Sequence, residues 1–201
     1  MWNRNENQII LTLIRHGRTK ANGEHRYLGK TEEALSAEGR EEIQAFVNQH
    51  RYSEADQVFT SSMKRCKETA AIIYPRIAAR EIPEWDEMDF GIFEGKNYVE
   101  LNGNPAYQDW IDSGGTLPFP EGESRAEFLS RCQKGMEKMI RELPEQTKRV
   151  AIVVHGGTIM ALLSTFYGGG YFDYQVPNGS GFQVILDMGN TEISFEGIKR
   201  I

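Results

Sequence analysis

The sequence predicts an α/β protein, a three-layer sandwich whose central sheet is mostly parallel. Two continuous apolar runs, residues 9–14 and 150–154, have the composition of strands buried on both faces of a sheet. Segments with helical spacing of apolar residues alternate with the strand-like runs, which is typical of parallel strands. The chain then closes with segments 181–186 and 192–198 around the turn-forming dipeptide at 189–190. We therefore expect a parallel sheet extended by an antiparallel hairpin.

Helix signals follow each strand in the first half of the chain. Residues 36–50 predict a helix that is capped by the serine at its start, because their apolar side chains share one face. A short strand at 58–60 comes next. Ser61 and Ser62 are the cap candidates for the following helix, which we expect to end near Pro75.

Residues 84–122 are the least regular part of the sequence. They are rich in glycine and proline, so we expect loops around one or two short helices, together forming a lid-like insertion. Ser124 and Glu127 form a capping box that begins a long helix ending at Pro144. Residues 156–166 then predict a last helix, directly after the second buried strand.

Composition and charge restrict the classes of function. The chain has 201 residues, 39% of them hydrophobic, and no repeat or linker, so we expect a single domain over residues 1–201. The net charge of -6 argues against nucleic acid and against an anionic membrane as the partner. The first apolar run is too short for a signal peptide or a membrane span, and we expect a soluble, cytoplasmic protein. The oligomeric state stays open, and an oligomer is compatible with the sequence.

The cysteines and histidines show neither a disulfide framework nor a metal site. Cys66 and Cys132 fall among apolar residues in helix-like stretches, so we expect two buried free thiols. The four histidines are scattered without the spacing of a zinc site. His25 and His50 have polar neighbours, and we assign both to the surface.

Cationic and imidazole side chains follow the predicted parallel strands. The first strand ends at Arg15 and His16, Arg65 lies one turn into the helix after the second, and His155 follows the third. Ligands of open parallel sheets bind at the carboxyl ends of the strands, where helix N-termini also point their free amides. Guanidinium groups there select phosphate or carboxylate. Considered alone, Arg65 is also compatible with a solvent-exposed position on a helix. His155 alone is also compatible with a histidine that has only a structural role.

The motifs around these residues resemble those of the histidine phosphatase superfamily, in its phosphoglycerate mutase-like branch. The resemblance covers residues 10–160 and implies the fold of that branch. It rests on six ordered motifs: Arg15-His16-Gly17 with Thr19 and Asn22, RYLGKTEEALSAEGREE (26–42), SSMKRCKETA (61–70), EMDFGIFEG (87–95), PEGES (120–124) and VVHGGTI (153–159).

The resemblance implies a role for each matching residue. His16 would be the nucleophile that forms a phosphohistidine, with Arg15 and Arg65 lowering its pKa so that it is neutral. Glu87 would protonate the leaving oxygen and then activate water. From the residues alone, Glu87 is not distinguished from Asp89 or from a surface carboxylate. No metal and no cofactor are expected, because arginines take the place of magnesium. The groups that would hold the phosphate are Arg15, Asn22, Arg65, His155 and Gly156.

The middle region distinguishes between the reactions known in this family. Mutases of the branch carry adjacent arginines there that grip the substrate carboxylate, whereas this chain has none between Lys96 and Arg125. A phosphomonoesterase acting on small phosphorylated metabolites is therefore favoured. The motifs RYLGKTEEALS and EMDFGIFEG resemble the alpha-ribazole phosphatase and broad-specificity groups, so alpha-ribazole 5'-phosphate is a candidate. The alternatives are a cofactor-dependent phosphoglycerate mutase and a non-catalytic phosphate-binding module.

Side chains outside the family motifs are candidates for contact with the rest of the substrate. The family motif most often has an acidic or amide residue at the position of Arg18. Arg18 would instead add a positive charge near the mouth of the site. Tyr107 and Trp110, with Tyr98 and Phe119, give the lid-like segment an aromatic character that suits an apolar or ring-bearing leaving group. The alternative is that these rings only pack the lid onto the core.

Overall fold

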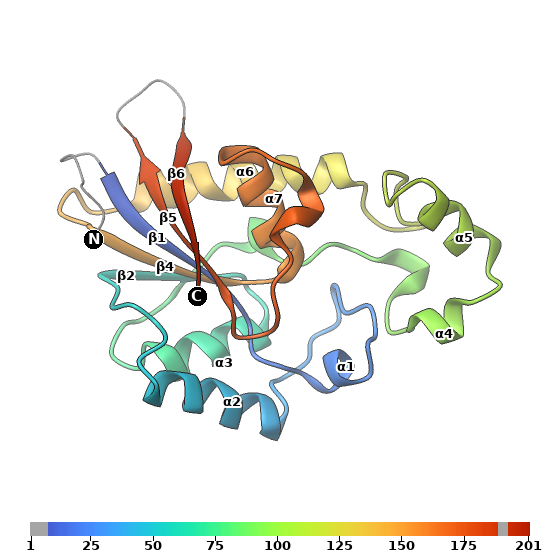
Figure 1. Ribbon diagram of the computed structural model, residues 1–201, viewed down its shortest axis with the longest axis horizontal. Coiled ribbons are helices and arrows are strands. Elements are labelled where there is room, and N and C mark those ends of the chain that lie inside the picture. Colours follow the sequence, from blue (N-terminus) through green and yellow to red (C-terminus); the bar gives the residue numbers. More distant parts are fainter. Residues whose placement is uncertain (1–7, 189–192) are drawn as a thin grey trace.

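A six-stranded sheet runs through the computed structural model, which describes residues 8–188 and 193–201 (Figure 1). The strand order across the sheet is β3-β2-β4-β1-β5-β6. The strands are β1 (Gln8–Arg15), β2 (Gln57–Thr60), β3 (Arg80–Glu81), β4 (Arg149–Val154), β5 (Gly181–Asp187) and β6 (Ser194–Arg200).

Helices cover both faces of this sheet and give the molecule three layers, with α2 and α3 on one face and α6 and α7 on the other (Figure 1). The α-helices are α1 (Lys20–Gly23), α2 (Ala37–Asn48), α3 (Lys64–Ile73), α4 (Tyr98–Leu101), α5 (Pro105–Asp112), α6 (Arg125–Glu142) and α7 (Gly156–Phe166). The 3-10 helices of the described residues are η1 (Pro83–Trp85), η2 (Gly91–Phe93) and η3 (Tyr171–Tyr174).

The sheet is mixed and mostly parallel, which confirms the predicted fold class. Strands β1 and β4, β4 and β2, and β2 and β3 pair in parallel, whereas β5 runs antiparallel to β1 and β6 antiparallel to β5. Arg15 of β1 lies opposite Val154 of β4, and Thr60 of β2 lies opposite Val153. The carboxyl ends of β1, β4 and β2 are therefore level, so the residues that follow these strands meet at one edge of the sheet.

Burial on both faces explains why the central strands are apolar throughout. Each residue from 150 to 154 is at most 1% exposed. Leu11 and Leu13 belong to the core cluster that includes α6 and α7, whereas Ala151 and Val153 belong to the cluster that includes α2 and α3. Successive side chains of a strand point to opposite faces, and here each face has a helical cover.

The two serines after β2 do not cap the next helix, and that prediction was wrong. Helix α3 follows Met63, which provides no side-chain cap. The Ser62 hydroxyl donates to Asp86 Oδ2 at 2.6 Å, and Ser61 Oγ lies 2.9 Å from His155 Nε2. Both hydroxyls thus contact residues that only the tertiary fold brings near, and Ser61 Oγ also accepts from the Met63 N–H at 3.3 Å.

The other predicted helices and strands are present with shifted boundaries. The terminal hairpin is present, but β6 begins at Ser194, and the predicted turn at 189–190 lies outside the described residues. Both cysteines are buried free thiols, as predicted. The elements that were not predicted include α1, β3, η1, η2 and η3, which have four residues or fewer, too few for a periodic pattern.

Residues 84–122 form loops around the two short helices α4 and α5, which Figure 1 shows at one end of the molecule, away from the sheet. Helix α5 begins where local chemistry favours it, because Asn104 accepts backbone N–H bonds and Pro105 fills the first helical position. None of the helices in the described ranges is long and apolar enough to cross a membrane.

Candidate active site

The level ends of β1 and β4 place two histidines side by side. His16 and His155 are 3% and 0% exposed, and their ring centroids lie 5.2 Å apart. The main chain fixes this approach, because the His16 N–H donates to the Val154 carbonyl at 2.8 Å. The structure therefore brings together the two histidines that the sequence placed 139 positions apart (155 − 16).

The surroundings of His16 keep its imidazole neutral. Burial lowers its pKa well below the usual range, and the positive charges of Arg65 and Arg15 lower it further. Burial is the larger cause, whereas the sequence predicted only the arginines. His16 Nδ1 lies 2.7 Å from the Gly17 carbonyl oxygen, which can only accept, so Nδ1 carries the proton. Nε2 is then the nitrogen with a free lone pair.

Arg65 is fully buried and connects the second strand to the rest of the site. Its Nη1 donates to the Thr31 carbonyl at 3.0 Å and its Nη2 to the Gly29 carbonyl at 2.8 Å. Its Nε donates to His155 Nδ1 at 3.3 Å, so the His155 proton is on Nε2, which faces Ser61 Oγ. These contacts exclude the reading of Arg65 as a solvated helix residue.

Arg15 contributes a second guanidinium beside the N-terminus of α7. Its Nη1 donates to the Val176 carbonyl at 2.7 Å, whereas its buried Nε has no hydrogen-bond partner among the described residues. A Cβ atom on Gly156 would lie 3.5 Å from that Nε, so the first residue of α7 adjoins the unpaired donor. A helix N-terminus next to a buried, unpaired N–H forms a site for an anion.

Glu87 is the carboxyl group of the site. It is 9% exposed, and its oxygens accept from the Met88 N–H at 3.0 Å and the Gly157 N–H at 3.3 Å. Burial raises the pKa of Glu87, against the opposing effect of these N–H groups and of the arginines. Asp89, the alternative, forms an ion pair with Lys30 at 2.6 Å, and its pKa is lowered. The buried carboxyl with a raised pKa is therefore Glu87.

Glycine at position 157 leaves room for the Glu87 carboxyl where it now lies. A Cβ atom on Gly157 would come within 2.3 Å of Glu87 Oε1. The second glycine after His155 thus makes room for the carboxyl against the first turn of α7, while its N–H binds the same group.

Several hollows adjoin Glu87, and two of them bear on the substrate. One, of about 260 Å³, is shared by Arg15, His16, Asn22 and Glu87. The other, of about 210 Å³, has mostly apolar walls that come from the lid-like segment, α7 and η3. The side chains that line the apolar hollow with Glu87 include Met88, Phe90, Trp110, Leu117, Phe119, Arg125, Met160, Tyr171 and Phe172.

The candidate substrate-contacting residues differ in whether they line one of these hollows. Trp110 and Phe119 line the apolar hollow, whereas Tyr107 lies outside its lining and stacks on Trp110 with ring centroids 6.4 Å apart. Tyr98, which is 62% exposed, lines the hollow beside His16. Arg18 does not line that hollow, because its guanidinium turns to Glu42 of α2 at 3.9 Å. The expected positive charge at the mouth is therefore directed elsewhere.

The sequence motifs did not identify several residues of the site. Asn178 Nδ2 donates to the His16 carbonyl at 3.0 Å and to Asn22 Oδ1 at 3.1 Å, which orients Asn22. It lies in the last forty residues, where no motif pointed to it. His25, assigned to the surface, is exposed but also lines the hollow beside His16. Arg125, which the sequence excluded from the lid, lines the apolar hollow.

The fold and the site together define a class of protein: an α/β fold with a neutral histidine, two neighbouring arginines and a buried carboxyl at the carboxyl edge of the sheet. Residues 11–195 match the model of the histidine phosphatase superfamily (branch 1), and the chain belongs to this superfamily. The family predicted from the six motifs is thereby confirmed. Proteins of this superfamily are phosphatases or mutases.

Comparison with individual proteins gives the same family. The chain is 33% identical over 159 residues to the uncharacterized phosphatase PhoE of Bacillus subtilis, covering 78% of this chain and 77% of that protein. It is 30% identical over 162 residues to the probable phosphoglycerate mutase GpmB of Proteus mirabilis, covering 78% and 74%. The alpha-ribazole phosphatase from Shigella flexneri has a similar fold, with a TM-score of 0.79 at 24% identity over 94% of this chain and 95% of that one.

Proposed function

We propose that this protein is a metal-independent phosphomonoesterase that hydrolyses small phosphorylated metabolites through a phosphohistidine at His16. One observation carries the proposal: a neutral imidazole, a carboxyl with raised pKa and Arg15 line one hollow, and the positive charge of Arg65 acts on both the imidazole and the carboxyl. A non-catalytic phosphate-binding module would need neither of these two groups. Hydrolysis of p-nitrophenyl phosphate by the purified protein tests the enzyme against that module.

The first step transfers the phosphoryl group to the protein. With the phosphate held by Arg15, Arg65 and the α7 N-terminus, His16 Nε2 attacks phosphorus as the bond to the leaving oxygen breaks. Glu87 gives its proton to that oxygen, so the product leaves as a neutral alcohol. In the second step water attacks the phosphohistidine and Glu87 takes a proton from it. Inorganic phosphate is released, and both side chains return to their starting states.

We further propose that the leaving group carries an apolar or aromatic ring. The hollow on the lid side of Glu87 is lined by Trp110, Phe119 and Tyr171, which offer burial and ring stacking. Alpha-ribazole 5'-phosphate stays the candidate, supported by its ring-bearing alcohol and by the fold shared with an alpha-ribazole phosphatase. Inside the cell, this activity would need no nucleic-acid or membrane partner, and we propose a cytoplasmic location.

Trp110→Ala is expected to lower kcat/KM for an aryl or nucleoside phosphate by roughly tenfold, the loss of about one well-packed aromatic contact. The same change should leave the low activity toward 3-phosphoglycerate nearly unaltered, because that substrate has no ring that Trp110 could contact. Steady-state kinetics with both substrates measure the difference.

Tyr107→Ala is the matched control, since Tyr107 belongs to the same aromatic group but lies outside the lining of the hollow. If the rings only pack the lid, both variants will change both substrates by similar factors. Equal or better use of 3-phosphoglycerate by the wild-type enzyme would also contradict the proposed substrate class.

A phosphoglycerate mutase is the second candidate, and Arg125 is the observation in its favour. Arg125 brings a cation to the leaving-group hollow, where a carboxylate could bind. However, its Nη2 donates to the carbonyls of Gly114 and Gly115, and its guanidinium lies 4.9 Å from the centre of the Tyr171 ring. Formation of 2-phosphoglycerate from 3-phosphoglycerate primed with 2,3-bisphosphoglycerate would establish the mutase instead.

Removal of metal ions is expected to leave the rate of hydrolysis unchanged, because Arg15 and Arg65 supply the positive charge that a metal would otherwise provide. Within residues 8–188 and 193–201, no group of three or more His, Cys, Asp and Glu side chains is placed to hold an ion. The rate is measured after dialysis against EDTA, with and without added magnesium. Loss of activity that magnesium restores would contradict this prediction.

The physiological substrate is identified by a screen of the purified protein against phosphorylated metabolites. The panel includes alpha-ribazole 5'-phosphate, nucleoside monophosphates, sugar phosphates and 3-phosphoglycerate. We expect the highest kcat/KM for an ester whose alcohol carries a ring. A preference for small acidic esters would exclude the proposed class of substrate.

A further inference from the structure

The PEGES motif at residues 120–124 has no part in the chemistry described above, yet the structure packs it against the segment that carries Glu87. The Glu123 N–H donates to the Asp89 carbonyl at 3.0 Å, and the Ile92 N–H donates to the Pro120 carbonyl at 3.0 Å. A Cβ atom on Gly122 would lie 2.5 Å from the Asp89 carbonyl oxygen, so the two backbones touch only because that residue is glycine. The motif is thus a support for residues 87–92.

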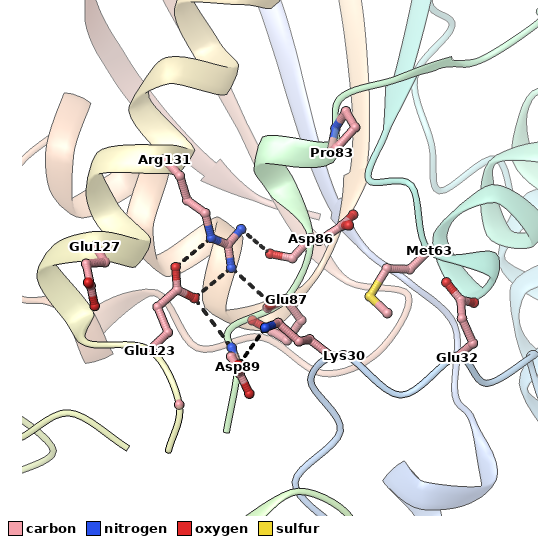
Figure 2. A pocket seen from close by; sticks show the side chains of 11 residues that line it. Lys30, Glu32, Met63, Pro83, Asp86, Glu87, Asp89, Glu123, Glu127 and Arg131 are labelled. Carbon is pink, nitrogen blue, oxygen red and sulfur yellow. Dashed lines mark hydrogen bonds and ion pairs between the residues drawn. The ribbon is translucent and has the colours of Figure 1, made fainter. Parts of the chain in front are cut away.

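Arg131 of α6 completes this support (Figure 2). Figure 2 shows its guanidinium between the Glu123 carboxylate on one side and the backbone of the Glu87 segment on the other. Nε and Nη2 donate to the two Glu123 oxygens at 2.7 and 2.8 Å, a bidentate pair. Nη1 donates to the Asp86 carbonyl at 2.6 Å and to the Glu84 carbonyl at 3.0 Å, and Nη2 also donates to the Glu87 carbonyl at 3.0 Å.

The pair is shielded enough for this geometry to persist. The Arg131 and Glu123 side chains are 25% and 15% exposed, so solvent screens their contact less than that of a surface ion pair. A planar guanidinium that meets three carbonyls and a carboxylate fixes several directions at once, which a flexible ammonium cannot do. Because the Glu87 carbonyl is held, the direction in which its side chain leaves the backbone is held as well.

We infer that Arg131, oriented by Glu123, is a positioning residue that places the Glu87 carboxyl for proton transfer. This inference rests on the proposed function, in which Glu87 protonates the leaving oxygen. Arg131 touches the backbone of the acid rather than the phosphate, so its effect must pass through Glu87. Misplacement of a catalytic group by about 1 Å costs on the order of 10²-fold in rate.

The test uses esters whose leaving groups differ in their need for a proton. p-Nitrophenyl phosphate releases a stable phenolate, whereas an alkyl phosphate releases an alkoxide that must be protonated. For Arg131→Gln we expect kcat to fall between about tenfold and 10²-fold with the alkyl ester, and by less than about threefold with the nitrophenyl ester. Glu123→Gln should show the same pattern more weakly, and Arg131→Lys should recover only part of the loss.

The double variant Arg131→Gln/Glu87→Gln separates positioning from general support of the fold. If Arg131 acts through Glu87, the double variant loses no more alkyl-ester activity than Glu87→Gln alone. Arg149→Gln is the matched control, because Arg149 pairs with Asp56 at 2.9 Å at the opposite end of β4 from His155. This control should lower the thermal unfolding temperature without changing the ratio of alkyl to nitrophenyl rates.

Equal fractional losses with both esters, or losses that multiply in the double variant, would overturn the inference. If Arg131→Gln does not fold, the ratio of the alkyl-ester rate to the nitrophenyl-ester rate in Glu123→Gln provides the same test. A wild-type protein that hydrolyses neither ester rejects the proposed function itself. In that case a carbon-13 NMR titration of Glu87 still tests the support. Arg131→Lys keeps the positive charge but loses the planar guanidinium, so a loosened segment that admits water should lower the raised pKa of Glu87 in Arg131→Lys but not in Arg149→Gln.

Discussion

His16→Ala is expected to lower kcat/KM for every phosphate ester by on the order of 10⁴- to 10⁶-fold, the loss seen when a covalent nucleophile is removed. No neighbouring side chain can replace it. The Cys66 thiol lies 3.5 Å from His155 Nε2, but burial raises its pKa to about 12, so it holds its proton at neutral pH. His155 is engaged by Arg65 and Ser61 on its two ring nitrogens.

Loss of the covalent intermediate is measured directly with a radiolabelled phosphate ester. The reaction is quenched in alkali, because phosphohistidine is destroyed by acid. Wild-type protein and a control with the exposed His50 changed, His50→Ala, should carry label, whereas His16→Ala should carry none. A His16→Ala protein that keeps more than a few per cent of the wild-type rate would show that the covalent mechanism is wrong.

Glu87→Gln has the second largest expected effect, and the effect depends on the leaving group. Removal of a general acid costs roughly 10²- to 10⁴-fold where the leaving oxygen must be protonated. We therefore expect a loss in this range for alkyl phosphates and a much smaller one for p-nitrophenyl phosphate. Phosphate binding should persist, because Arg15 and Arg65 are unchanged. Product-inhibition constants for inorganic phosphate measure that binding.

The dependence of the rate on pH follows from the two shifted groups. The pKa of Glu87 is raised, so the carboxyl is protonated below that pKa and the rate with alkyl esters falls as the pH rises through it. The pKa of His16 is lowered well below its usual range, so the imidazole stays neutral, and no loss from His16 is expected near its ordinary pKa. Glu87→Gln should abolish the fall at higher pH while any fall from titration of the substrate remains. An unchanged profile would exclude Glu87 as the acid.

Much of the fold could be predicted because local patterns determine local structure. The runs at 9–14 and 150–154 are apolar throughout since both faces of β1 and β4 are covered, and Ser124 with Glu127 forms the capping box that begins α6. The convergence of His16 and His155 followed from topology alone, because parallel strands end at the same edge. Family motifs were needed to prefer Glu87 over its acidic neighbours.

The sequence by itself determined the fold class, the family and the histidines and arginines that meet at the edge of the sheet, since these lie at strand ends or inside contiguous motifs. Only the tertiary structure decided which partners those residues have. Asn178 reaches His16 across 162 positions, Arg18 turns to Glu42, and Arg131 supports the segment of Glu87. A side chain at a strand end is placed by the backbone before it, whereas a contact between distant segments depends on how every element between them packs. No local spacing records that packing.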